Sequence, residues 1–464
     1  MRNAFSVSIL CLVAMGFCVA ATDAPQVRIE TGVLSGATVD GVNMFKGIPF
    51  AAPPVASLRW RAPEPPASWT GVRAATGYGN DCMQIPVPSD AAPLGMPPAE
   101  DCLYANVWRP AGSDGKLPVM IWIYGGGFVN GGASPPTYSG AELAKQGIVV
   151  VSFNYRIGRF GFFAHPALTR ENDDDGLLAN YGYMDQLAAL KWVKRNIASF
   201  GGDPANVTIV GESAGGMSIH ALATSPIAQG LFQRMVILSG PSGRPADATL
   251  NAAETAGATF AEANGIARDA PDAVSRLRAL PADRVMNGLN MSTMSAPGPR
   301  PFLGPVIDGR LAVDNLKAYR EGHFRHIPAM IGATSDDMGG PKGRMVTGTR
   351  EAVTTLAGQG VPVYYYRFSY VAGSARTPET KGARHATDIP FFFDTAAVKY
   401  GGETTATDRA AAKVASRYMV NFVRTGDPNG SGLPIWQPYS RDRKHMLDLN
   451  AEGSATLLVE DDDS

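Results

Sequence analysis

Short apolar runs with the length of buried β-strands recur along the chain and alternate with amphipathic segments of helical period. Six such runs stand at residues 118–124, 148–153, 207–210, 235–238, 328–333 and 361–368. Between the second and the third run, Leu187, Leu190, Val193 and Ile197 share one face of a helix, which predicts a helix over 185–199. A second helix is expected over 408–424. This alternation predicts an α/β protein whose mainly parallel sheet carries helices on both faces.

Other segments depart from this alternation. Residues 27–42 alternate and contain glycines, which predicts a β-hairpin or a small sheet. Residues 241–300 are rich in Ala and Pro with weak helical patterns, and we interpret them as a helical lobe inserted over the functional site. The acidic residues 460–463 are expected to be solvated. Residues 22–464 are therefore expected to form one domain with an insertion at about 241–300.

The strand predicted at 207–210 ends on the pentapeptide GESAG at residues 211–215. This is the G-x-S-x-G pattern, in which glycines allow a sharp turn that exposes a serine between a strand and a helix. The turn presents the hydroxyl of Ser213 to a base and directs the amide of Ala214 toward an oxyanion formed beside it. The strand before the pattern and the small residues after it favour a nucleophile over a glycine turn with a bystander serine.

A second glycine-rich turn, Gly125–Gly127, follows the strand predicted at 118–124. Successive glycines at the end of a strand can direct several N–H groups to one point, which suits the binding of an oxyanion. Because ligands bind at the C-terminal ends of strands in open α/β sheets, this turn and Ser213 are expected at the same edge.

A serine nucleophile needs a base, and proteins of this kind present serine, acid and histidine in that chain order. Among the six histidines, His385 lies in a loop after the strand predicted at 361–368 and is the best candidate. We expect its imidazole to be neutral near pH 7. The acid should follow a strand between Ser213 and His385, and Asp336 and Asp337 both satisfy this condition. Spacing alone does not choose between them.

Composition narrows the function further. The net charge is −1 and charged residues make up 18% of the chain, so nothing indicates binding of nucleic acid. Residues 1–21 have the pattern of a secretory signal peptide cleaved after Ala20 or Ala21, which predicts a secreted or periplasmic protein without a stable membrane anchor. Removal of this segment leaves Cys82 and Cys102, which are expected to form a disulfide. No cluster of residues with metal-ligand spacing is present, and we predict neither a metal nor another cofactor.

The sequence resembles the type-B carboxylesterase/cholinesterase family of α/β-hydrolases along nearly all of the expected mature chain. The segments that carry the resemblance are FGGDPANVTIVGESAGG, EDCLYANV, FKGIPFAAPPVASLRW, WIYGGGF, NYRIGRFGF, YGYMDQLAALKWVKRNIASFGGDP and NFVRTGDPNG. The second segment departs from the family pattern at Ala105, where the family has a larger aliphatic residue.

The resemblance implies an α/β-hydrolase fold and assigns a role to each matching position. Asp337 stands where the family usually has Glu, which favours it over Asp336. The stretch from Asp337 to His385 lacks the longer helical insert of the family, so we expect a more open acyl side. The full set of implied roles is Ser213 as nucleophile, His385 as base, Asp337 as acid, Gly126, Gly127 and Ala214 as oxyanion donors, Glu212 and Ser218 as a second polar shell, and Cys82 with Cys102 as a disulfide.

These assignments predict a serine hydrolase that cleaves small-molecule carboxylic esters through an acyl-enzyme. An alternative is the same chemistry on a specialised substrate, such as a lactone, carbamate, amide or polyester. A less favoured alternative is a non-catalytic recognition protein on the same fold. Trp122, Phe128 and residues 391–393 suggest an uncharged aromatic or aliphatic substrate. The expected assembly is a monomer or a weak homo-oligomer.

Overall fold

The computed structural model describes residues 24–87, 92–113, 115–171, 174–243, 248–294 and 302–460. The predicted signal peptide at 1–21, with its cleavage after Ala20 or Ala21, lies outside these residues. None of the helices within the described ranges is long and apolar enough to cross a membrane.

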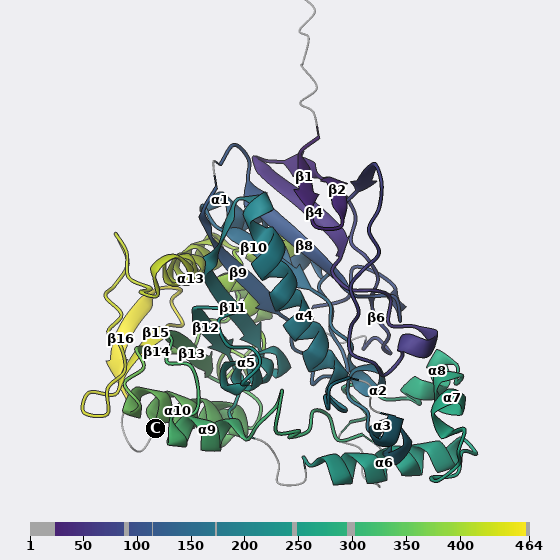
Figure 1. Cartoon of the computed structure of the whole chain (residues 1–464). Helices are drawn as coiled ribbons and strands as arrows, with labels where there is room; N and C mark the ends of the chain where they lie inside the picture. Colours follow the sequence, from purple (N-terminus) through teal and green to yellow (C-terminus); the bar gives the residue numbers. More distant parts are fainter. Residues whose placement is uncertain are drawn as a thin grey trace, which may run out of the picture.

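One large twisted sheet runs through the molecule (Figure 1). It has eleven strands, and its middle strands are parallel while the strands at both edges are antiparallel. In spatial order the strands are β16 (Ala455–Val459), β15 (His445–Leu449), β14 (Val363–Phe368), β13 (Ala329–Thr334), β12 (Arg234–Leu238), β11 (Gly202–Glu212), β9 (Leu117–Ile123), β10 (Val149–Phe153), β8 (Tyr104–Pro110), β4 (Val42–Pro49) and β3 (Ala37–Val39).

The six predicted apolar runs are β9 to β14, and they lie next to one another in the parallel part of the sheet. The predicted N-terminal hairpin is also present. It is formed by β1 (Gln26–Ile29) with β2 (Gly32–Ser35), while β3 pairs with β4. The edge strands β15 and β16 were not predicted. The fold is thus the expected α/β arrangement, extended by an antiparallel pair at its C-terminal edge. The remaining strands form two small sheets. In one, β5 (Val72–Ala74) pairs with β2, and in the other β6 (Asp81–Cys82) pairs with β7 (Pro98–Ala99).

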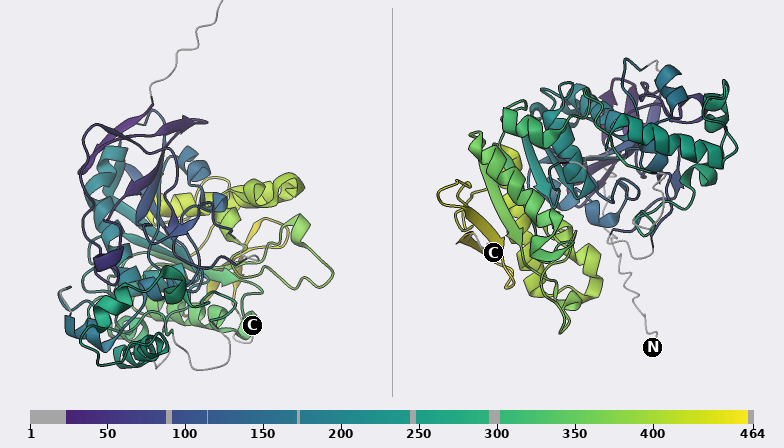
Figure 2. Two further views of the ribbon diagram at one scale, coloured as in Figure 1. Left: turned by 90° about the vertical axis from the view of Figure 1, so that its right-hand side faces the viewer. Right: turned by 90° about the horizontal axis from the view of Figure 1, so that it is seen from below.

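Helices cover both faces of the sheet. The helices α4 (Tyr181–Asn196), α5 (Ala214–Thr224) and α10 (Arg344–Gly358) lie in front of the sheet in Figure 1. The helix α13 (Ala406–Thr425) packs on the other face, as Figure 2 shows, and α1 (Ala141–Lys145) lies beside it. The predictions of helices at 185–199 and 408–424 are confirmed by α4 and α13, whereas α10 was not predicted.

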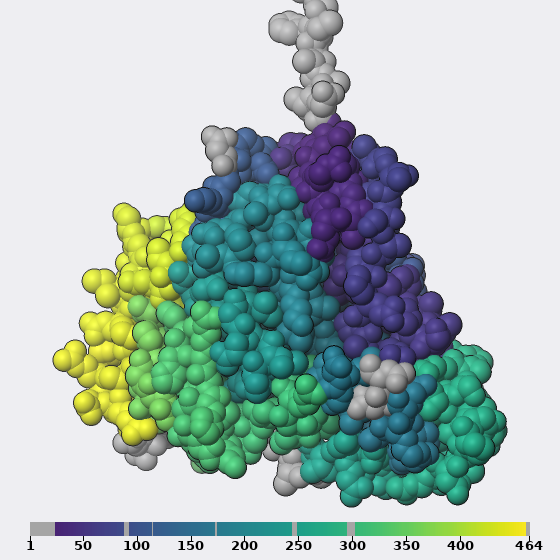
Figure 3. Space-filling model, in the orientation of Figure 1, coloured from purple at the N-terminus to yellow at the C-terminus, as the bar shows by residue number. Residues whose placement is uncertain are grey.

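The segment 241–300 contains α6 (Leu250–Ala263), α7 (Ala273–Arg278) and α8 (Ala282–Met286), at the lower right of Figure 3. Two buried arginines of the body fasten this lobe through its backbone. Arg59 donates to the carbonyl oxygens of Arg278 and Leu280 at 3.0 and 2.6 Å. Arg159 donates to those of Val285 and Met286 at 3.1 and 2.7 Å. The two guanidinium groups therefore donate hydrogen bonds to backbone carbonyl groups at the ends of α7 and α8.

Short helices link the remaining elements: α2 (Gly158–Gly161), α3 (Pro166–Glu171), α9 (Asn315–Glu321), α11 (Ile389–Phe392) and α12 (Ala396–Tyr400). At the C-terminal edge, the expectation of a solvated acidic tail is wrong for Glu460. Its side chain is buried and forms an ion pair of 2.7 Å with Arg350 of α10. The positive charge of Arg350 compensates the negative charge of the buried Glu460 carboxylate. Residues 461–463 lie outside the described residues.

Candidate active site

Ser213 lies in the tight turn between β11 and α5, as the G-x-S-x-G pattern predicts. Its backbone has φ 52° and ψ −119°, a conformation that costs free energy for a residue with a side chain. The glycines on either side permit this turn because nothing larger fits. A Cβ on Gly215 would lie 2.0 Å from the carbonyl oxygen of Ile123, and one on Gly211 would lie 2.6 Å from the carbonyl carbon of Gly215. Close packing of α5 on β9 and β11 therefore holds the strained serine in place.

The glycine turn after β9 lies directly beside Ser213. A Cβ on Gly125 would come within 3.0 Å of the Cβ of Ser213. Gly126 and Gly127 have φ values of 96° and 62°, which favour glycine. Within the described part of the chain, the amides of Gly126, Gly127 and Ala214 donate no hydrogen bond to a protein group. Unengaged N–H groups beside a serine are what an oxyanion site requires.

The structure brings Asp337, and not Asp336, against His385. The Nδ1 atom of His385 lies 2.7 Å from Oδ1 of Asp337. The loops that carry Asp337 and His385 run side by side. The amide of Asp336 donates to the carbonyl of Ala383 at 2.9 Å, and the backbones of Asp336 and Arg384 form an isolated parallel β-bridge. This pairing brings the backbone of the short aspartate close enough to reach the imidazole.

Hydroxyl groups from two neighbouring strands hold the other oxygen of Asp337. Ser239 and Thr334 each donate a hydrogen bond of 2.7 Å to Oδ2. Burial opposes ionisation of this carboxyl, but its hydrogen bond to His385, the charge of His385 and the two hydroxyls keep its pKa below the usual value. Sequence reasoning missed Ser239 and Thr334, although both follow predicted strands at the edge where Asp337 lies.

The other imidazole nitrogen of His385 faces the acidic residue of the turn. Nε2 lies 3.1 Å from Oε1 of Glu212, and no hydrogen bond joins His385 to Ser213 among the described residues. Burial lowers the pKa of His385, but the negative charges of Glu212 and Asp337 outweigh it and raise the pKa to about 9. The expectation of a neutral imidazole near pH 7 is therefore wrong for this resting arrangement.

A third carboxyl group, which sequence reasoning did not identify, lies beneath the histidine. Asp388 is fully buried and accepts a hydrogen bond of 3.2 Å from the hydroxyl of Tyr366. Burial, together with the charge of Asp337, raises the pKa of Asp388 to about 7. Its position three residues after His385 was visible in the sequence, but nothing there indicated that its side chain turns inward.

Ser218 and the aromatic residues predicted for the site do not face the candidate reacting groups. Ser218 donates to the carbonyl of Ala214 at 2.8 Å and accepts from Gln186 at 3.0 Å, so it supports the first turn of α5. Trp122 and residues 391–393 have no exposed surface and belong to the core, and Phe128 is 5% exposed. These aromatic side chains therefore give no support to an aromatic or aliphatic substrate.

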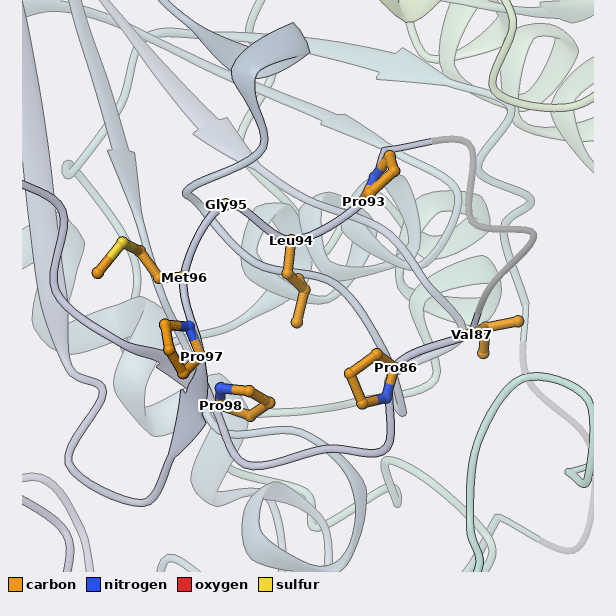
Figure 4. A pocket seen from close by; sticks show the side chains of 8 residues that line it. All are labelled: Pro86, Val87, Pro93, Leu94, Gly95, Met96, Pro97 and Pro98. Carbon is orange, nitrogen blue, oxygen red and sulfur yellow. The ribbon is translucent and has the colours of Figure 1, made fainter.

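Cys82 and Cys102 form the expected disulfide, and the loop that it closes is bonded to Asn130, three residues after the glycine turn. The buried amide of Asn130 donates to the carbonyl of Ile85 at 2.8 Å and to Oε1 of Gln84 at 3.1 Å. This loop lines a hollow of about 530 Å³ with eight residues, of which four are proline. Figure 4 shows these eight residues along the loop. None of the eight is a candidate catalytic residue, so the hollow does not contain the candidate reacting groups.

Among the described residues, no group of three or more histidine, cysteine, aspartate or glutamate side chains has the geometry of a metal site.

Comparison with known proteins identifies the class. The sequence model of the carboxylesterase family matches residues 23–344 and 341–462. Fumonisin B1 esterase from Sphingopyxis macrogoltabida is 34% identical over 502 residues, which cover 95% of this chain and 89% of that protein. Para-nitrobenzyl esterase from Bacillus subtilis is 34% identical over 495 residues, which cover 94% of this chain and 96% of that protein.

Solved structures agree with this result. A structure of a para-nitrobenzyl esterase has a TM-score of 0.83 at 31% identity and covers 94% of this chain and 98% of its own. The carboxylesterase of Geobacillus stearothermophilus has a TM-score of 0.79 at 32% identity, with the same coverage. The chain belongs to the carboxylesterase family, has the α/β-hydrolase fold and is a serine hydrolase of carboxylic esters.

The contact between Glu212 and His385 predicts the pH dependence of the enzyme. His385 is the base that the sequence predicts, and a base must be neutral, so kcat/KM should rise with pH as its imidazolium of pKa about 9 loses the proton. The substitution Glu212→Gln removes a negative charge that stabilises the imidazolium, so the rising limb should move to lower pH. Profiles of kcat/KM against pH, measured for the wild type and Glu212→Gln with one aryl ester, test this prediction.

The matched control is Glu171→Gln. Glu171 forms an ion pair with Arg278 of the lobe, so removing its charge should leave the rising limb of the profile in place. An unmoved limb in Glu212→Gln would contradict the assignment of the pKa to this contact.

Proposed function

We propose that Ser213 is the nucleophile, His385 the base and Asp337 the acid of this carboxylesterase, with Gly126, Gly127 and Ala214 as the oxyanion donors. The observation that carries the proposal is the placement of His385 between Asp337 and the turn that bears Ser213. Asp337 fixes the tautomer of His385 by accepting the Nδ1 proton, which leaves Nε2 directed toward that turn.

The first half of the reaction acylates the serine. Nε2 of neutral His385 takes the hydroxyl proton as Oγ of Ser213 attacks the ester carbonyl. The negative charge that develops on the carbonyl oxygen is stabilised by the amides of Gly126, Gly127 and Ala214. Loss of one such donor typically costs about 3 kcal/mol in the activation barrier. His385 then protonates the leaving alcohol, and water hydrolyses the acyl-enzyme through the same groups.

Glu212 has a positional role in this scheme. In the resting state its carboxylate lies 3.1 Å from Nε2 and stabilises the imidazolium through its charge. The same negative charge stabilises the imidazolium that forms while the serine attacks. Nε2 must turn from Glu212 to Oγ of Ser213 when substrate binds, and hydrogen bonds of this kind often tighten only in the substrate complex.

We further propose that the acyl side of the site is open and accepts bulky or irregular acyl groups on small-molecule esters. The support is the short stretch of 48 residues from Asp337 to His385. The match to the family model breaks into two pieces at residues 341–344, directly after Asp337. We also propose that the protein is exported, because residues 1–21 have the pattern of a signal peptide. The proposed assembly is a monomer or a weak homo-oligomer.

Covalent labelling tests the nucleophile. A fluorophosphonate should add one adduct to the wild type, observed as intact mass, and should abolish hydrolysis of a short aryl ester. Ser213→Ala should give no adduct and no turnover above background. Ser218→Ala serves as the control, because Ser218 supports α5 without facing the reacting groups, and it should still label. An adduct on folded Ser213→Ala would overturn the assignment.

Substitution of each aspartate in turn distinguishes the two candidates for the acid. Asp337→Asn should lower kcat by about 10³- to 10⁴-fold, because the amide can present its N–H to Nδ1 and select the wrong tautomer. Asp336→Asn should keep a kcat close to that of the wild type, since the structure uses only its backbone against Ala383. Steady-state kinetics at saturating ester, with circular dichroism as a check of folding, measure both. The reverse order of effects would make Asp336 the acid.

The openness of the acyl side can be measured with a series of aryl esters that share one alcohol. A closed pocket discriminates by about 10- to 200-fold against one methylene group. We expect kcat/KM to vary by less than about tenfold between acetyl, butyryl, hexanoyl and benzoyl esters. Strict preference for the acetyl ester would show that the acyl side is closed.

A further inference from the structure

Two exposed methionines converge on the glycine turn that we assign to oxyanion binding. Met291 and Met294 are 37% and 38% exposed, and they follow α8 at the end of the lobe. A Cβ on Gly127 would lie 2.7 Å from the sulfur of Met291 and 3.1 Å from that of Met294. Both sulfurs therefore lie against the same glycine, in two residues that are partly exposed to solvent.

A buried side chain anchors the backbone at Met291. Oδ1 of Asn130 accepts a hydrogen bond of 2.8 Å from the amide of Met291. The backbone amide of Asn130 in turn donates to the carbonyl of Gly126 at 2.9 Å. One residue thus joins the methionine segment to the glycine turn, so the contact does not depend on the side chains of Met291 and Met294 alone.

Methionine is the oxidisable residue type at this surface. Both cysteines within the described ranges are joined in the disulfide, so they offer no thiol to an oxidant. The large apolar residues that are exposed in the described ranges include three methionines, Met291, Met294 and Met338. Oxidation of an exposed thioether converts an apolar side chain into a polar one that carries a hydrogen-bond acceptor.

We propose that Met291 and Met294 are a reversible oxidation site that inhibits the esterase. Hydrogen peroxide transfers one oxygen atom to the sulfur, forming an S–O bond and breaking the O–O bond. The thioether is oxidised by two electrons to the sulfoxide, and the peroxide is reduced to water. Both sulfurs stand where a Cβ of Gly127 would point, so we infer that the sulfoxide oxygen reaches the amide of Gly127, which has no protein acceptor in the described structure. There it accepts the hydrogen bond of this amide and competes with the oxyanion for it. Methionine sulfoxide reductase, with a thiol reductant, restores the thioether.

This proposal rests on the assignment of the oxyanion donors, and the experiment separates the two. Untreated wild type is first shown to hydrolyse a short aryl ester and to take one fluorophosphonate adduct. It is then treated with hydrogen peroxide, and oxygen incorporation at each methionine is measured by peptide mass spectrometry. We expect kcat/KM to fall by at least about tenfold, less than the 10²- to 10³-fold loss caused by deleting one oxyanion donor. Methionine sulfoxide reductases should recover the activity, while the melting temperature should stay unchanged.

Matched variants locate the effect. In Met291→Leu/Met294→Leu the ratio of treated to untreated activity should stay near one, because leucine keeps the apolar contact and cannot be oxidised. Met338→Leu removes the third of the exposed methionines named above and should still be inactivated by peroxide.

The proposal would be overturned if wild type that is oxidised at Met291 and Met294 retained full activity. Equal inactivation of the wild type and the double variant would also overturn it. If the double variant does not fold, recovery of oxidised wild type by the reductases, followed residue by residue, gives the same decision. Failure of the untreated enzyme to label or turn over would instead refute the proposed function.

Discussion

The close approach of α5 to the middle strands is the constraint on which the rest of the site depends. Gly215 leaves no room for a Cβ against the carbonyl oxygen of Ile123, and Gly211 leaves none against Gly215. Only this contact allows the chain to reverse within one residue and hold Ser213 in a backbone conformation that a free chain avoids. The large buried sheet stabilises the strained residue, because its hydrophobic core would have to open before the turn could relax.

The electrostatics of the site follow from three carboxyl groups placed around one imidazole. Asp337 is held ionised by two hydroxyls and the histidine, Glu212 contacts Nε2, and Asp388 lies buried with a pKa raised to about 7. Burial by itself would favour the neutral imidazole, yet the carboxylates reverse that preference and raise the pKa of His385 to about 9. The arrangement therefore favours a protonated imidazole before substrate is bound. An imidazole that is readily protonated suits a step in which it must accept a proton while the oxyanion forms.

The sequence predicted those elements that have a recognisable pattern of residues within their own segment of the chain. The parallel strands β9 to β14, the helices α4 and α13, the serine turn and the disulfide each have a signal of their own in composition or period. The edge strands β15 and β16 were missed because they are short and lie where the chain carries polar turn residues. The choice between Asp336 and Asp337 could not be made from spacing, because it depends on how the backbone of Asp336 pairs with the loop before His385.

Charge states and substrate-facing surfaces were least accessible to sequence reasoning, because they depend on contacts between distant segments. The neutral histidine expected at pH 7 ignored the turn of Nε2 toward Glu212, and the aromatic residues expected in the pocket proved to be core. What does reach the glycine turn is the end of the lobe, fastened by Asn130 over 161 residues of sequence and by the buried arginines Arg59 and Arg159. The sheet and the serine turn therefore set the geometry of the candidate reacting groups, while the lobe end supplies side chains beside the glycine turn. A change in the sequence of the lobe end would alter the surroundings of these groups without altering the groups themselves.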